Sequence, residues 1–205
     1  MSFPSFSNFG FQKKKTFPMV LSAVSNGNFS SYEIQTALGG GTNFTTIFGS
    51  SSASTTLNTT LLPAWVVTIP SGNIYVIIST GNSVWYPSDR ILPAGAENSN
   101  VVIFQFNQKV ANTTGTISQN VNLAVGMRTL SFYASSRVGT APNVTFSVSL
   151  GGTTLASSIL PTNTDFTLCT YTYQATTNGT YQLVITLTNR VSGDNTINFA
   201  NVNIT

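Results

Sequence analysis

The side chains that most often carry enzyme chemistry are scarce in this sequence. Its 205 residues include no histidine, which removes the usual general base, the Ser-His-acid triad and the commonest metal ligand. The five acids are scattered, and only Asp89 and Glu97 share one stretch, "WYPSDRILPAGAE". A glycosidase needs two carboxylates across a cleft, whereas Asp89 beside Arg90 is typical of a local ion pair. We therefore predict that the protein is not an enzyme and that it needs no cofactor.

Aromatic rings and planar amides, the side chains that bind sugars, are more plentiful. Trp85 and Tyr86 lie in a turn-rich stretch, "GNSVWYPSDR", and are the candidate platforms for a glycan, although packing over the edge of the core would explain them equally well. Four amides, Asn98, Asn100, Gln105 and Gln119, could hydrogen-bond a sugar or simply line a polar strand face, and Asn98 and Gln105 are the candidate glycan contacts among them. Trp65 alternates with Val67 and Ile69, which favours a place in the core.

Charge is sparse and unevenly placed. Only 6% of the residues are charged, and the formal net charge of +3 equals the contribution of Lys13, Lys14 and Lys15. The remaining basic residues balance the acids, so the body is neutral and offers no electrostatic footprint for nucleic acid. No apolar run approaches the roughly 18 residues of a membrane span. We therefore expect neither nucleic-acid binding through the body nor a membrane span.

The elements that must position these residues are strands. Period-two alternation of apolar residues marks four segments as strands, namely Ile117–Leu123, Leu130–Ala134, Val144–Leu150 and Tyr181–Leu187. In each segment we expect the first residue and every second residue after it to face the core. Three further segments, "AWVVTI", "NIYVIIST" and "VVIFQF", are apolar on both faces and are expected to be central strands. Turn signals such as "LGG" and "SGDN" separate the segments. A change of phase in "TINFANVNIT" predicts a bulge in the last strand.

Several motifs carry a resemblance in their order and spacing. "SNGNFSS" (25–31) is followed by "GTISQNVNLAVGMRTLSFYASSR" (115–137), "VTFSVSLGGTTLAS" (144–157), "DFTLCTYTYQATTNGTYQLVITLTN" (165–189) and "NFANVNI" (198–204). In this order they resemble the jelly-roll carbohydrate-binding modules of the galactose-binding-like group. The resemblance covers about residues 25–205 and implies an all-β fold, an antiparallel β-sandwich of jelly-roll type.

The same resemblance bears on metal binding. In that group an acid often follows the Asn-Gly-x-Phe motif and another stands in the closing strand, and together they help to hold a structural calcium. Here the two places are Ser30 and Ala200, which have no carboxylate. Because a hard cation prefers charged oxygens, a calcium site of this type is doubtful, although Glu33 and backbone carbonyls could partly substitute.

The first twenty residues have neither helical nor strand periodicity. Lys13–Lys15 precede "TFPMVLSAVS", but the apolar stretch is short and contains Pro18, so we do not interpret it as a secretory signal. We predict an extended docking arm over residues 1–24, ahead of a sandwich domain over 25–205. Packing on its own domain is the alternative for the arm. Its anchors and charges are Phe3, Phe6, Phe9, Phe11, Lys13, Lys14, Lys15 and Phe17.

Cys169 is the single cysteine, so no disulfide can form within the chain, which suits synthesis in the cytosol. A jelly roll with a neutral body, a terminal arm and no disulfide leads to the first hypothesis, a structural protein of a large assembly. Its simplest form is a minor capsid or surface component of a large virus particle. It would dock on other protein subunits through its arm and be located in the virion or another extracellular particle. The alternative is a carbohydrate-binding module, secreted, that recognises a cell-surface or cell-wall glycan.

Overall fold

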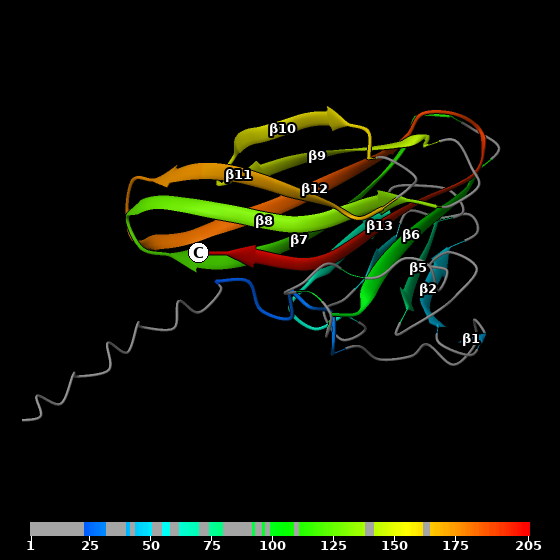
Figure 1. Cartoon of the computed structure of the whole chain (residues 1–205), viewed down its shortest axis with the longest axis horizontal. Helices are drawn as coiled ribbons and strands as arrows, with labels where there is room; N and C mark the ends of the chain where they lie inside the picture. Colours follow the sequence, from blue (N-terminus) through cyan, green and yellow to red (C-terminus); the bar gives the residue numbers. More distant parts are fainter. Residues whose placement is uncertain are drawn as a thin grey trace, which may run out of the picture.

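The computed structural model describes residues 23–31, 40–41, 44–50, 55–57, 62–69, 74–79, 92, 96, 99–108, 111–137, 142–161 and 165–205. Within these residues all regular secondary structure is β-strand (Figure 1). None of them forms a helix that could cross a membrane.

Two antiparallel sheets face each other in a β-sandwich. Sheet A holds seven strands, in spatial order β1 (Gly40–Gly41), β2 (Phe44–Ser50), β5 (Ile74–Ser79), β6 (Val101–Gln108), β13 (Gly193–Ile204), β8 (Gly126–Ser136) and β11 (Thr167–Ala175). Sheet B holds six, in the order β10 (Thr153–Ile159), β9 (Val144–Leu150), β12 (Gly179–Asn189), β7 (Thr113–Leu123), β4 (Val66–Ile69) and β3 (Thr55–Leu57). Most connections pass from one sheet to the other, as in a jelly roll, so the predicted fold class is confirmed.

The main core lies between the sheets and is rich in aromatic rings. Phe132 and Phe199 of sheet A pack on Phe146 of sheet B, with ring centroids 5.5 and 5.8 Å from the Phe146 ring. The rings meet at steep angles of 72° and 77°, close to the edge-to-face arrangement that aromatic pairs favour. Each fully buried ring contributes about 1.5–3 kcal/mol by leaving water.

A second, smaller apolar layer covers the outer face of sheet A, the face turned away from sheet B. Ile77 and Ile103 point into this layer, where Leu92, Ala96 and Phe166 cover them. The neighbours of Ile77 and Ile103 on β5 and β6 point into the main core instead. This second layer explains why the segments around β5 and β6 are apolar on both faces, as expected of central strands.

The alternation predicted for the longer strands is confirmed. Along β7, β8 and β9 the expected inward side chains are buried, and along β12 they are buried except for the half-buried Tyr181 at its edge. The predicted turn after Leu150 is a two-residue hairpin, in which Gly151 and Gly152 both have positive φ (57° and 80°). Glycine suits this turn because both of its central residues need a left-handed backbone.

The predicted bulge in the last strand is also present. The register between β13 and β8 shifts between Ala200 and Asn203, and Asn201 has a φ of 51°. Phe199 on one side and Val202 on the other both reach the main core, while Ala200 faces the outer layer. The bulge therefore keeps the apolar residues of both halves of the strand inside.

Candidate functional site

The N-terminal segment that carries the Asn-Gly-x-Phe motif is fixed beside sheet B. The Asn26 side chain donates to the carbonyl of Pro63 (3.1 Å) and exchanges two hydrogen bonds with the backbone of Ser31 (2.8 and 3.0 Å). The Trp65 indole donates to the Asn26 carbonyl (3.0 Å), and the Phe29 ring lies 5.6 Å from the Trp65 ring. The motif therefore has a structural role, because its contacts hold the N-terminal segment in place. Trp65 lies in the core as expected.

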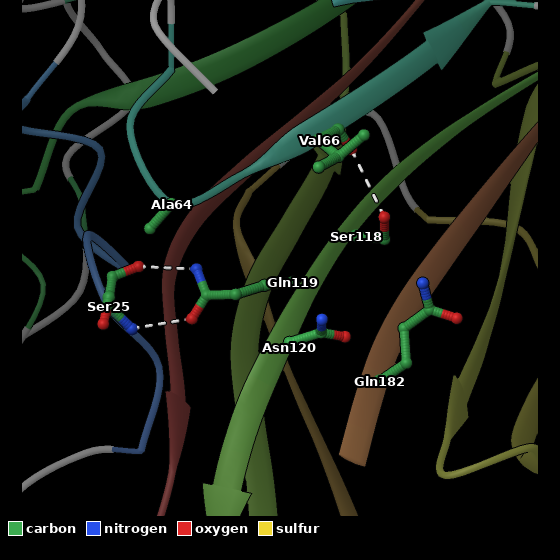
Figure 2. A pocket seen from close by; sticks show the side chains of 7 residues that line it. All are labelled: Ser25, Ala64, Val66, Ser118, Gln119, Asn120 and Gln182. Atoms are coloured by element: carbon green, nitrogen blue, oxygen red, sulfur yellow. Dashed lines mark hydrogen bonds between the residues drawn. The ribbon is translucent and has the colours of Figure 1, made fainter. Parts of the chain in front are cut away.

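Gln119 ties the same segment to β7. Its side-chain oxygen accepts from the Ser25 backbone N–H (2.7 Å) and its side-chain nitrogen donates to the Ser25 carbonyl (2.8 Å), as Figure 2 shows. Both polar ends of this buried amide are thus paired, which is what burial of an amide requires. Gln119 was a candidate sugar contact, but in the structure it positions the main chain at Ser25.

A recess of about 310 Å³ lies on the outer face of sheet B, next to this tie. It is shaped by three strands and the segment before β1, and its lining residues are Ser25, Ala64, Val66, Ser118, Gln119, Asn120 and Gln182 (Figure 2). β4 pairs with β7 only from Thr116 to Ser118. Beyond Ser118 the segment that contains Ser25, and not β4, lies next to β7. The recess lies where β4 gives way to this segment.

Two carboxamides at the recess have no hydrogen-bonding partner among the described residues. Asn120 of β7 and Gln182 of β12 are opposite each other in the β7–β12 ladder, and both are exposed. Figure 2 shows their amides without a bond, whereas the nearby Ser118 hydroxyl donates to the Val66 carbonyl at 3.5 Å. Each free amide can donate through its nitrogen and accept through its oxygen. The recess thus offers paired donors and acceptors beside the apolar surface of Ala64 and Val66.

The surroundings of the recess carry no charge within the part of the chain that the structure describes. The outward side chains of β7, β9 and β12 are hydroxyls and amides apart from one valine, namely Thr114, Thr116, Ser118, Asn120, Asn122, Thr145, Ser147, Ser149, Thr180, Gln182, Val184, Thr186 and Thr188. A neutral polar ligand therefore fits this face better than an anion or a cation.

The titratable groups with shifted pKa values lie elsewhere. Burial raises the pKa of Cys169 on β11 to about 11, and a hydrogen bond with Tyr171 opposes this only in part. Burial, with Cys169 nearby, raises the pKa of Tyr171 to about 12. Hydrogen bonds with Thr177 lower the pKa of Tyr181. Cys169 and Tyr171 belong to sheet A, so neither group acts at the recess.

Of the described residues that could contact a sugar, Gln119 lines this recess, whereas Asn100 and Gln105 do not. Gln105 lies on β6 of sheet A, where its side-chain nitrogen donates to Asp194 (2.8 Å). The same carboxylate forms an ion pair with Arg137 (2.9 Å). Trp85, Tyr86 and Asn98 lie outside the described residues, and their role stays a prediction.

Two further expectations concern the docking arm and the calcium site. The anchors of the docking arm, from Phe3 to Phe17, lie outside the described residues, but Val24 at the end of the predicted arm is part of the main core. Ser30 is exposed and Ala200 is buried, and the described residues contain no group of three acids, histidines or cysteines that could hold a metal. The doubt about a calcium site therefore stays a prediction.

The recess itself was missed at the sequence level. The alternation that places Ile117 and Val121 inside also places Ser118 and Asn120 outside, so the sequence alone predicts that Ser118 and Asn120 face solvent. What the sequence does not show is that β12 lies beside β7 and that Gln182 comes to stand opposite Asn120. The strands are separated by some sixty residues, and no local pattern identifies such a pair.

Comparison with known proteins gives matches to structures only, since the sequence matches no protein-family model and no curated protein. One similar structure is the module TmCBM61 in complex with beta-1,4-galactotriose (13% identity, 70% of this chain and 88% of that chain, TM-score 0.48). Another is the CBM22-1 xylan-binding domain from Paenibacillus barcinonensis (13% identity, 76% and 96%, TM-score 0.41). A third is the enzymatically active domain of tailspike protein 4 of bacteriophage CBA120 (15% identity, 89% and 21%, TM-score 0.46). Similar structures thus include carbohydrate-binding modules, the group that the sequence motifs resemble.

Proposed function

We propose that the protein is a non-catalytic glycan-binding module and that the recess on the outer face of sheet B is its binding site. The observation that carries the proposal is a pair of carboxamides, Asn120 and Gln182, that lie side by side and have no partner among the described residues, in a recess whose described lining is uncharged. Sugar hydroxyls both donate and accept, and a carboxamide meets both needs in one plane. Ala64 and Val66 supply apolar surface for the C–H groups of a sugar ring.

The expected ligand is a neutral oligosaccharide. None of the described residues that line the recess is charged, so they offer nothing with which to bind a sulfated, phosphorylated or acidic sugar. No aromatic ring lines it either, so the stacking that strengthens sugar binding has to come from outside the described residues or be lacking. We therefore expect weak binding that depends mainly on hydrogen bonds, with the resemblance of the sequence motifs to carbohydrate-binding modules as independent support.

The proposal is tested by screening the full chain on an array of neutral and acidic glycans and measuring the best neutral ligand by calorimetry. A neutral hydrogen bond contributes about 0.5–1.5 kcal/mol, so Gln182→Ala and Asn120→Ala should each weaken binding by about 2- to 10-fold. Gln174→Ala on β11 removes a matched exposed amide from the other sheet and should leave the affinity unchanged. Equal losses in all three variants, or a preference for acidic glycans, would contradict the proposal.

The leading hypothesis from the sequence, a particle protein that docks through residues 1–24, gains no support from the described residues. Its anchors lie outside them, and the prediction of a virion location stays untested. The binding of a glycan is compatible with such a location, because surface proteins of a particle can recognise a host glycan.

A further inference from the structure

The four sheet edges of the described structure differ sharply in how they are protected. An exposed edge strand presents unpaired backbone N–H and C=O groups, and proteins usually guard it by shortening, bulging or charging it. The edge strands β1 and β3 have two and three residues. β10 is interrupted twice in its register with β9, and Ser158 within it has a φ of 53°. Three of the four edges are therefore blunted.

β11, the fourth edge strand, has none of these devices. It pairs with β8 over nine residues, from Thr167 opposite Ala134 to Ala175 opposite Gly126, without a register shift. Its sequence, "TLCTYTYQA", contains no charge, proline or glycine and is rich in residues that favour strands. No described strand pairs with its free side, and Figure 1 shows β11 at the margin of sheet A beside β10.

Exposed apolar side chains accompany this edge. Leu168 near the start of β11 is 54% exposed, and Ile159, the last residue of β10, and Leu160 after it are 38% and 39% exposed. β10 and β11 contact each other across the two sheets, and the short segment after Leu160 leads directly into β11. β11 thus combines a backbone edge that no described strand pairs with and an exposed apolar side chain, Leu168, and a strand laid along β11 would pair with that edge.

We propose that β11 is a pairing edge at which a second copy of this chain adds its own β11 in antiparallel orientation. The strand is uncharged and can therefore lie against itself without repulsion. The nearest described charge before the strand is Asp165, which is exposed. Antiparallel pairing keeps the two Asp165 carboxylates at opposite ends of the joined strands, whereas parallel pairing would place them side by side.

The pairing has a defined register if the two strands overlap fully. The two-fold axis then passes at Tyr171, the middle of β11, and Thr170 of one copy lies opposite Thr172 of the other. Both side chains are exposed on the outer face of sheet A. Sheet A would become continuous across the two copies, an arrangement in which the same patch serves both partners. The recess on sheet B lies on the opposite sheet and stays open.

The test is the oligomeric state of the full chain, measured by sedimentation over a hundredfold range of protein concentration. We expect a dimer that dissociates on dilution. The double variants Thr170→Lys/Thr172→Lys and Thr170→Glu/Thr172→Glu place like charges opposite each other and should both be monomers at concentrations where the unaltered chain is dimeric. An equimolar mixture of the two variants should be dimeric again, because opposite charges then meet.

The control adds the same positive charge away from the edge, as Ser30→Lys/Ser192→Lys, and should leave the dimer intact. All variants should keep the melting temperature of the monomer, because the altered residues are exposed. A chain that is monomeric at every concentration would overturn the proposal. Dimers that persist in the charged β11 variants, or that are lost equally in the control, would overturn it as well.

Discussion

Gly27 has no room for a side chain, because the N-terminal segment lies directly against β13. A Cβ at this position would collide with the carbonyl oxygen of Val202, and the Val202 backbone N–H donates to the Gly27 carbonyl (2.9 Å). The backbone of β13 cannot move aside without disturbing its ladder, so a methyl group must displace the segment itself. The glycine of the Asn-Gly-x-Phe motif is thus required by a close approach of two backbones.

Gly27→Ala should therefore lower the free energy of unfolding by about 1–3 kcal/mol, the usual cost of overpacking. Gly179→Ala is the matched control, because a Cβ there meets nothing within 4 Å. Urea unfolding of the two variants measures the difference. If both lose the same stability, the segment is not held against β13 as described.

Cys169 should behave as an inert thiol. Burial raises its pKa from 9.0 to about 11, so its thiolate fraction at neutral pH is about 100-fold lower than that of an ordinary cysteine. Alkylation at pH 7 should be correspondingly slow. The neutral thiol stabilises the fold below about pH 9, and this contribution is lost as the pH rises towards about 11.

The comparison with Cys169→Ala isolates this effect, because that variant cannot titrate at the position. The stability of the unaltered chain should fall relative to Cys169→Ala between about pH 9 and 11. A thiol that ionises near pH 8 in ultraviolet titrations would contradict the partial burial of the side chain against the main core.

The elements show what the sequence could and could not reveal. Alternation predicts the inward faces of β7, β8, β9 and β12 because one face of each strand must leave water. The phase change in β13 likewise predicts its bulge. Val66 departs from the expectation of a strand buried on both faces, since it lies half-exposed at the recess although β4 is flanked by β7 and β3. A strand's own residues do not say whether a neighbouring segment covers it.

The bulge in β13 gives a prediction at this scale. Asn201 has a φ of 51°, which costs an L residue with a Cβ about 1–2 kcal/mol and costs glycine nothing. Asn201→Ala and Asn201→Gly both remove the side chain that accepts from Asn203 (3.1 Å). Thermal or urea unfolding should therefore show Asn201→Gly to be the more stable of the two. The reverse order would mean that the chain does not turn at Asn201.

For the whole molecule, the fold was accessible from the sequence and the candidate site was not. The motifs and the periodicity of the strands suffice for a two-sheet sandwich, because both report local demands of burial. The recess depends on three contacts of long range: the hydrogen bonds of Ser25 with Gln119, the short pairing of β4 with β7, and the pairing of Asn120 with Gln182. Each of these is set by where the chain returns after many residues, which no local pattern encodes.

The central claim, that this recess binds a neutral glycan through its free amides, is tested most directly by nuclear magnetic resonance of the side-chain amide groups. The full chain is titrated with the best neutral oligosaccharide from the array, and the carboxamide signals are assigned with the single variants. We predict that the signals of Asn120 and Gln182 move first and farthest, while those of Gln174 and Gln105 on sheet A stay in place. Movement confined to sheet A, with Asn120 and Gln182 unchanged at saturation, would contradict the account.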